Sequence, residues 1–419
     1  MSESAADREG APGQQDEVPD DRQMAGFKDF YQFSAPTRVI AGRDLLDSAG
    51  FEFAKEGAHR VLLVTDTVIR ATGLADRVAA GLADGGLDVA AVFDAVPQDS
   101  DNDVVAAIAT LAAEGEADSF LALGGGSVMD SAKAANVLFT HGGQARDWEG
   151  FYGLPRADHG AGRALELAPL ACIPTTAGTG SEVSWAAVIK DREAHVKYQI
   201  GDFALIPRLA ILDPAATATL PPALAAATGM DAMTHAIEGY ASRDWNAHAD
   251  AFALQALRLI AANLERAVHD TTDETARGNM LIAASLAIAP TNCGAIGIAH
   301  SLSHACGARF DVPHGIANAI NLPVAIEYNA AGGEDIAARY RDIGELLGIE
   351  TGGDIGHVLA EHVRELVRSL GLPTRLSQVG VPESGIPLLV EGAMGDACTL
   401  VNPRTATAEE VAELYRQAL

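Results

Sequence analysis

The fold of this chain is decided by SFLALGGGSVMDSAK, residues 119–133, where a short apolar run passes through three glycines into a helical pattern. Glycines allow backbone N–H groups to approach an anion closely, and the N-terminus of a helix adds positive partial charge. A diphosphate fits such a turn. The spacing matches neither the usual dinucleotide fingerprint nor a P-loop, and a plain flexible loop is the alternative. The cofactor-binding candidates in this stretch are Gly124, Gly125, Gly126, Ser127 and Asp130.

Strand-like and helical stretches alternate on both sides of this turn. Helical periodicity is present at Gly73–Ala83 and Asn102–Glu114. The expected strands are Arg60–Asp66, Val89–Val96, Ser119–Leu123 and Leu170–Pro174. Strands separated by crossover helices predict a parallel, doubly wound, Rossmann-like sheet, which binds nucleotides at the carboxyl ends of its strands.

The second half of the chain has a different pattern, in which strand-like runs are scarce. Its expected helices are Pro222–Ser242, Ala247–Val268, Asp273–Ile288, Gly315–Tyr328, Gly356–Leu370 and Ala408–Ala418. We therefore expect three segments: a disordered acidic tail at 1–24, a dinucleotide-binding α/β domain at 25–214, and an all-α metal-binding domain at 215–419.

Composition narrows the classes of function. Of the 419 residues, 48% are hydrophobic, and 29 Lys and Arg against 57 Asp and Glu give a net charge of −28. That charge repels phosphate backbones and anionic lipid, so neither nucleic acid nor a membrane is expected as a partner. Met280–Ala308 has no charged residue, but its Pro, Asn and Gly residues favour a buried helix pair over a membrane span. Four separated cysteines and no signal sequence predict a reducing, cytoplasmic location.

A second loop also follows an expected strand. It is PTTAGTGSE at 174–182, whose hydroxyls and glycines can donate to ribose or phosphate or can form simple Ser/Thr turns. Lys133 and Lys197, two of only five lysines, lie in or shortly after these loops and are expected to serve an anionic ligand. Asp66 ends the first strand. There its carboxylate can accept hydrogen bonds from the adenosine ribose and repel the 2′-phosphate of NADP. Alternatively, it can cap the N-terminus of a helix.

Asp and His residues in the helical half have metal-ligand spacing. Asp231 and His235 are four residues apart, as are His300 and His304, so each pair shares a helical face. His314 follows in DVPHG, where Asp311 and Pro313 suggest a helix start. One Asp with three His is a donor set suited to four-coordinate Fe²⁺ or Zn²⁺.

Together these motifs resemble the iron-containing (group III) alcohol dehydrogenases, a family that includes lactaldehyde reductases and 1,3-propanediol dehydrogenases. The carrying motifs are LGGGS at 123–127, IPTTAGTGSE at 173–182, GMDAMTHAIEGY at 229–240, IAHSLSHACG at 298–307, DVPHGIANAI at 311–320 and NPR at 402–404. The resemblance implies a dehydroquinate synthase-like architecture, a homodimer, NAD as cofactor and a small alcohol or aldehyde as substrate.

The resemblance also implies residue roles. Asp231, His235, His300 and His314 would be the metal ligands, and His304 the non-ligating site histidine beside the substrate. Asp66 falls where a family carboxylate discriminates against NADP. The positions at pyrophosphate and nicotinamide ribose would be Gly125, Gly126, Ser127, Thr175, Thr176, Thr179, Ser184 and Lys197.

The expected reaction is reversible hydride transfer between a primary alcohol or diol and NAD, with the metal acting as a Lewis acid. Two competitors remain: a lyase or cyclase of the dehydroquinate synthase type, which uses NAD only transiently, and a non-catalytic nucleotide-binding protein. Two departures from the family concern the substrate, namely Ser-Trp-Ala-Ala at 184–187 and Thr-Asn-Cys at 291–293. Trp148, Phe151 and Tyr152 are further candidates for lining the cleft, or for packing.

Overall fold

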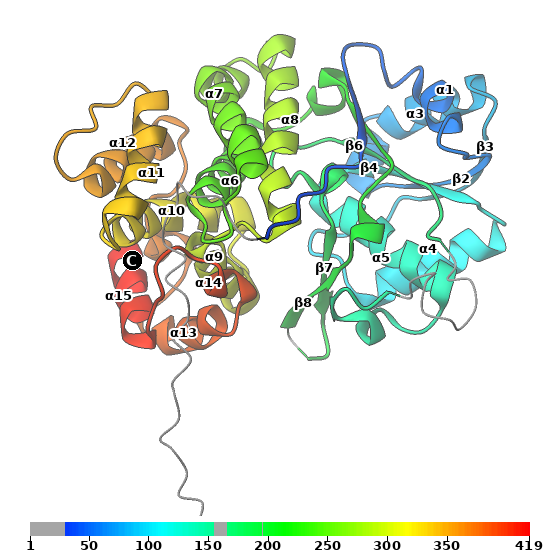
Figure 1. Cartoon of the computed structure of the whole chain (residues 1–419). Helices are drawn as coiled ribbons and strands as arrows, with labels where there is room; N and C mark the ends of the chain where they lie inside the picture. The colour runs from blue at the N-terminus through cyan, green and yellow to red at the C-terminus, as the bar shows by residue number, and fades with distance from the viewer. Residues whose placement is uncertain (1–29, 155–165, 195) are drawn as a thin grey trace, which may run out of the picture.

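The computed structural model describes residues 30–154, 166–194 and 196–419. The acidic tail expected at 1–24 lies outside the described residues. Figure 1 shows an α/β part, on the right, beside a part built from helices α6 to α15, on the left. This is the two-part architecture expected from the sequence, with strands up to residue 212 and helices after it.

Six parallel strands form the main sheet, in the order β1-β9-β6-β4-β2-β3. The four strands expected from the sequence are present in its middle and at one edge. The expectation omitted β1 and β9, which complete the other edge. The strands are β1 (Arg38–Ala41), β2 (Arg60–Val64), β3 (Asp88–Phe93), β4 (Ser119–Gly124), β6 (Leu170–Pro174) and β9 (Leu209–Leu212).

Alternate residues of the central strands pack on opposite faces of the sheet, because successive side chains of a strand point in opposite directions. Leu62 and Phe120 pack with α4 and α5 on one face. Val61 and Leu121 pack with α1 and α3 on the other. Both faces are therefore covered, as a parallel sheet requires. The helices of this part are α1 (Ala49–Ala54), α2 (Thr67–Ala71), α3 (Leu74–Asp84), α4 (Asn102–Glu114) and α5 (Gly126–His141).

The chain order of the strands places a switch point between β2 and β4. From β2 the chain proceeds outward to β3 and then returns to the other side of β2 as β4. The hydroxyl of Thr65 donates to the carbonyl of Leu123 at 2.8 Å and ties the two carboxyl ends together. Ligands of such sheets bind beyond the strand ends at this kind of position. The glycine turn at 124–126 lies there.

A small second sheet was not expected. It contains β5 (Gly150–Phe151), β7 (Ala186–Asp191) and β8 (Val196–Gly201), with β7 and β8 antiparallel. Its outer surface carries an aromatic cluster in which Trp185 stacks on Phe151 at 5.3 Å between ring centroids. Tyr152 packs on the same indole, while Trp148 donates to the carbonyl of Gly142 at 3.1 Å.

The helical half matches the expected segments closely. Its helices are α6 (Pro222–Ala241), α7 (Ala247–His269), α8 (Glu274–Ile288), α9 (Ile298–Phe310), α10 (His314–Ala330), α11 (Glu334–Leu346), α12 (Ile355–Ser369), α13 (Ile386–Met394), α14 (Ala397–Leu400) and α15 (Ala408–Ala418). One large core unites all of these helices except α14, none of whose residues belongs to it. The expectation did not specify α11, α13 and α14. All four cysteines are free.

Among the described residues, no single helix is long and apolar enough to cross a membrane. One pair, Glu274–Cys293 with Ile298–Phe310, reaches the required length and composition together, but it is bent by 101°. This pair contains the uncharged segment Met280–Ala308, and most of its residues are buried in the helical core.

Candidate metal centre and dinucleotide groove

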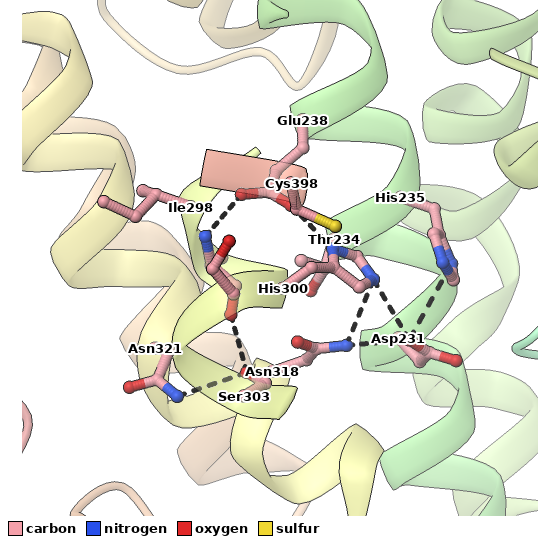
Figure 2. A network of polar contacts seen from close by, with 12 residues as sticks. Asp231, Thr234, His235, Glu238, Ile298, His300, Ser303, Asn318, Asn321 and Cys398 are labelled. Carbon is pink, nitrogen blue, oxygen red and sulfur yellow. Dashed lines mark hydrogen bonds and ion pairs between the residues drawn. The ribbon is translucent and has the colours of Figure 1, made fainter. Parts of the chain in front are cut away.

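The proposed metal ligands converge from three helices. Asp231 and His235 lie one turn apart on α6, with Nδ1 of His235 3.7 Å from Oδ1 of Asp231. The same Oδ1 lies 3.7 Å from Nε2 of His300 on α9 and 3.3 Å from Nε2 of His314 on α10. Figure 2 shows Asp231, His235 and His300 turned toward one another. The structure thus brings all four candidate ligands together.

The donor set fits a divalent cation. Metal bonds of about 2.0–2.2 Å to nitrogen and oxygen place two ligands of one ion roughly 3–3.5 Å apart, close to the separations from Asp231. Asp231, His235 and His300 are all buried. Nδ1 of His235 is a buried nitrogen without a hydrogen-bond partner among the described residues. Such a buried, unsatisfied nitrogen is expected where a metal supplies the missing interaction.

The charges of the cluster also suit a cation. Burial opposes ionisation of Asp231, yet the facing imidazoles of His235 and His314 hold the pKa of its carboxyl well below its usual range. Burial lowers the pKa of His235 to about 3. Burial also disfavours the charged form of His300, but hydrogen bonds to Asp231 and Glu238 raise its pKa to about 9. A cation held here would face one ionised carboxylate, and it would compete with the proton that these contacts favour on His300.

His314 is the first residue of α10, and Pro313 occupies the N-cap position, in agreement with the helix start expected in DVPHG. Asp311 does not start this helix but ends α9 in the left-handed region, with φ of 51°. The side chain of His314 is 35% exposed.

Three polar residues beside the ligands were not predicted. Glu238 lies 2.6 Å from Nδ1 of His300. The amide nitrogen of Asn318 donates to Oδ1 of Asp231 at 2.8 Å and lies 3.1 Å from Nε2 of His314. A sequence signal existed for Glu238, because positions 231, 235 and 238 share one face of a helix.

His304 is held by the third unpredicted residue, Asp396. The Oδ2 atom of Asp396 lies 2.8 Å from Nδ1 of His304. The ring of His304 stacks on that of His314, at 5.2 Å between centroids and 16° between planes. Burial opposes ionisation of Asp396, but His304 holds the pKa of its carboxyl well below its usual range. His304 therefore lies beside the ligand set, and an ionised carboxylate orients it.

The two glycine-containing loops lie against each other at the carboxyl edge of the sheet. The N–H of Thr175 donates to the carbonyl of Gly124 at 3.0 Å. A Cβ on Gly126 would lie 2.8 Å from the Thr179 side chain, and one on Gly125 would lie 3.4 Å from Thr176. A side chain at position 126 would therefore force Thr179 to shift, whereas the contact at position 125 is an ordinary one. The two loops lie together at the N-terminus of α5.

These loops adjoin the metal centre. A Cβ on Gly178 would lie 2.6 Å from the carbonyl oxygen of Thr228, one turn before Asp231 on α6. From the other side, Nζ of Lys197 lies 4.0 Å from the Cβ position of Gly307, one turn after His304 on α9. The ammonium of Lys197 pairs with Asp99 at 2.7 Å. Asp99 also donates its N–H to the hydroxyl of Ser127 at 3.2 Å.

Three of the residues expected to bind the cofactor form hydrogen bonds with other residues of the protein. Oδ1 of Asp66 accepts from the N–H of Ile69 at 2.8 Å and caps α2, the simpler of its two interpretations. The carboxylate of Asp130 accepts from Ser181 and from the N–H of Val188. Ser184 accepts from the ammonium of Lys133. Asp130 and Ser184 therefore connect α5 to the segment at 181–188.

Lys133 does not face an anionic ligand, contrary to the expectation. It is fully buried, and its ammonium donates to the Ser181 hydroxyl at 2.8 Å and to the Ala186 carbonyl at 3.0 Å. It also donates to the carbonyl and the hydroxyl of Ser184. The lysine joins α5 to the second loop, so its role is to hold the two loops together.

We expect Lys133→Met to lower the free energy of unfolding by about 3 kcal/mol, because four buried acceptors lose their donor. The matched control is Lys55→Met, since the Lys55 side chain is 61% exposed in a surface ion pair and its loss is expected to cost about 0–1 kcal/mol. Urea unfolding of both variants measures the difference. Equal midpoints for the two variants would show that the buried ammonium is not a structural link.

The departures in the substrate region have structural roles. The amide of Asn292 donates to the carbonyls of Ser34 and Val183, at 3.1 Å each. Phe151 and Tyr152 are 44% and 52% exposed, and they pack on Trp185. Packing is therefore the observed role of these aromatic side chains.

Comparison with known proteins agrees with this geometry. A family model described as iron-containing alcohol dehydrogenase matches residues 36–214, and one described as the C-terminal part of the Fe-containing alcohol dehydrogenase family matches 225–419. The chain is 34% identical to an NAD-dependent methanol dehydrogenase of Bacillus methanolicus over 391 residues, 92% of this chain and 99% of the relative. It is 34% identical to a lactaldehyde reductase of Escherichia coli strain K12 over 384 residues, 90% of this chain and 96% of the relative.

Solved structures give the same result. A crystal structure of a 1,3-propanediol oxidoreductase matches with a TM-score of 0.87 and 33% identity, covering 93% of this chain and 100% of the other. An alcohol dehydrogenase from Oenococcus oeni also matches with a TM-score of 0.87, at 29% identity, covering 93% of this chain and 100% of the other.

Proposed function

Because the chain belongs to the iron-containing alcohol dehydrogenase family, we propose that it transfers hydride reversibly between a primary alcohol or diol and NAD. Fe²⁺ is the proposed metal, held by Asp231, His235, His300 and His314. The observation that carries the proposal is the convergence of these four side chains from α6, α9 and α10 close to the two glycine-containing loops.

The residues of the chain divide the work of the reaction. When bound, the metal supplies Lewis acidity, which lowers the pKa of an alcohol hydroxyl. The diphosphate is bound by backbone donors at the N-terminus of α5, from Gly124, Gly125, Gly126 and Ser127. The nicotinamide ribose is held by Thr175, Thr176 and Thr179 of the second loop and by Lys197, which lies near α9. His304, oriented by Asp396, accepts the alcohol proton and passes it to solvent.

An alcohol and aldehyde panel on Fe²⁺-reconstituted protein, with NAD and with NADP, tests this function. We expect net NADH formation from primary alcohols, loss of turnover after chelation, retention of NAD binding, and partial recovery with Zn²⁺. NAD turnover without net NADH would instead indicate a lyase or cyclase of the dehydroquinate synthase type, which the comparisons do not favour. Binding of NAD with no reaction would indicate a non-catalytic nucleotide-binding protein.

Asp66 bears on the choice of cofactor. Its Oδ1 caps α2, and its carboxylate stands at the end of β2 beside the switch point, where it would repel a 2′-phosphate. We therefore propose a preference for NAD over NADP, which the same panel measures.

Assembly and location stay proposals as well. We propose a homodimer with small-molecule substrates, working in a reducing, cytoplasmic compartment with neither nucleic acid nor membrane as partner. The free cysteines support the reducing compartment, and the net charge of −28 supports the lack of a nucleic-acid or membrane partner. The dimer rests on the family resemblance. Light scattering during size-exclusion chromatography measures the mass, and a single-chain mass would contradict the dimer.

A further inference from the structure

The N-terminus of α9 is capped by side chains distant in the sequence. Its own N-cap residue, Gly297, has no side chain to offer. The amide of Ile298 donates to Oδ1 of Asn402 at 3.0 Å, and the amide of Ala299 donates to Oε1 of Glu238 at 2.6 Å. Two of the free amides at this helix start are thereby satisfied.

Glycine at position 297 makes room for both acceptors. A Cβ there would lie 2.7 Å from Oε1 of Glu238 and 3.0 Å from Oδ1 of Asn402. Asn402 is held in turn by Asn329, since the side-chain NH₂ of Asn402 donates to Oδ1 of Asn329 at 2.7 Å. Asn402, from the NPR motif, and Glu238, from α6, thus fix where α9 begins, and His300 is the third residue of this helix.

Glu238 makes a second contact that Asn402 does not. Its other oxygen, Oε2, lies 2.6 Å from Nδ1 of His300. His300 and Glu238 are 1% and 3% exposed, so water does not compete with this contact. Oε1 of Glu238 accepts from the N–H of Ala299, and Oε2 presents a second acceptor to Nδ1 of His300, so this geometry makes Nδ1 the donor nitrogen of the ring. Nε2 is the nitrogen that faces Asp231.

We propose that Glu238 is a positioning residue that fixes the tautomer and ring orientation of His300, so that Nε2 faces the metal. The inference rests on the proposed function for the identity of the ligands. Carboxylate partners of metal-bound histidines act in this way, and their removal typically weakens metal binding 10- to 100-fold. Figure 2 shows Glu238 on the side of His300 away from Asp231, as this role requires.

Glu238→Gln tests the tautomer with little change in shape. Glutamine has one acceptor where glutamate has two. If its oxygen keeps the Ala299 amide, its NH₂ faces Nδ1 and favours a proton on Nε2, which blocks the metal position. If the amide is reversed, its NH₂ opposes the Ala299 N–H. We expect Zn²⁺ to bind metal-free Glu238→Gln about 10- to 100-fold more weakly than the unsubstituted protein.

Asn402→Ala is the matched control, because it removes the neighbouring cap of the same helix end without touching His300. It should lower the melting temperature of the metal-free protein while Zn²⁺ affinity is preserved. A spectroscopic signature separates orientation from packing. In Zn²⁺-loaded protein labelled with ¹⁵N-histidine, we expect a downfield Nδ1 proton for His300 that persists in Asn402→Ala and is lost in Glu238→Gln.

Two results would overturn the inference: unchanged Zn²⁺ affinity in Glu238→Gln, or an equal loss of affinity in Asn402→Ala, which would assign the effect to the helix end. Failure of the unsubstituted protein to bind Zn²⁺ or Fe²⁺ at all is a different outcome. It would overturn the proposed function itself, and the role of Glu238 with it.

Discussion

Asp231→Asn is expected to abolish metal-dependent turnover and to weaken metal binding by more than the roughly 100-fold found at most for outer partners of a metal site. Oδ1 of Asp231 lies between the three histidines, at 3.3–3.7 Å from a nitrogen of each. It supplies the negative charge of the ligand set. Asparagine keeps the shape but removes this charge, and a divalent ion loses its strongest electrostatic partner.

The measurement is metal content after reconstitution, together with NADH formation from an alcohol. NAD binding should persist, because the proposed diphosphate site consists of the end of β4, the start of α5 and the loop at 174–182 and does not include Asp231. The matched control is Asp335→Asn, at an exposed carboxylate near the start of α11, which should keep full metal content and turnover. An Asp231→Asn enzyme with stoichiometric iron and normal turnover would remove the basis of the proposed function.

Features set by neighbours in the sequence were predicted well. The bounds of α4 and α15 match the expected ranges, and α6 differs by one residue. Asp231 and His235 were placed on one face of a helix from their spacing alone, because the helical repeat fixes which positions are neighbours. The resemblance then identified which residues of the two halves belong to one site.

Short strands were the main omission in the fold. β1 and β9 have four residues each, RVIA and LAIL, and runs of that length do not distinguish a strand from a helix end. The two strands pair with each other although they are distant in the sequence: Arg38 of β1 pairs with Leu209 of β9, more than 170 positions later. Tertiary pairing, rather than local preference, therefore decides these strands.

Long-range polar partners were the main omission in the site. Glu238 lies 62 positions from His300, and Asp396 lies 92 positions from His304. Spacing within one helix says nothing about such pairs. Lys133 was misjudged for a related reason. Scarcity of lysine suggested a ligand contact, whereas its acceptors are buried atoms of 181–186, about fifty positions away.

The second large effect is expected at Asp396→Asn, which should lower kcat about 100-fold while metal content and NAD binding are retained. Oδ1 of Asp396 accepts from the N–H of Cys398 at 2.8 Å, and asparagine can keep this cap. Its NH₂ then faces Nδ1 of His304, where the carboxylate had accepted. The favoured tautomer places the proton on Nε2, so His304 can no longer take a proton from the substrate through that atom.

The expected pH dependence of the Asp396→Asn effect follows from the direction in which the pKa of Asp396 is shifted. His304 holds the pKa of Asp396 below its usual range against the effect of burial, so the carboxylate stays ionised above about pH 4. The loss in Asp396→Asn should therefore persist from pH 6 to pH 9. The matched control is Asp354→Asn, another N-cap aspartate, which accepts from the N–H of His357 on α12. Unchanged kcat in Asp396→Asn, or an equal loss in Asp354→Asn, would exclude Asp396 from the orientation of His304.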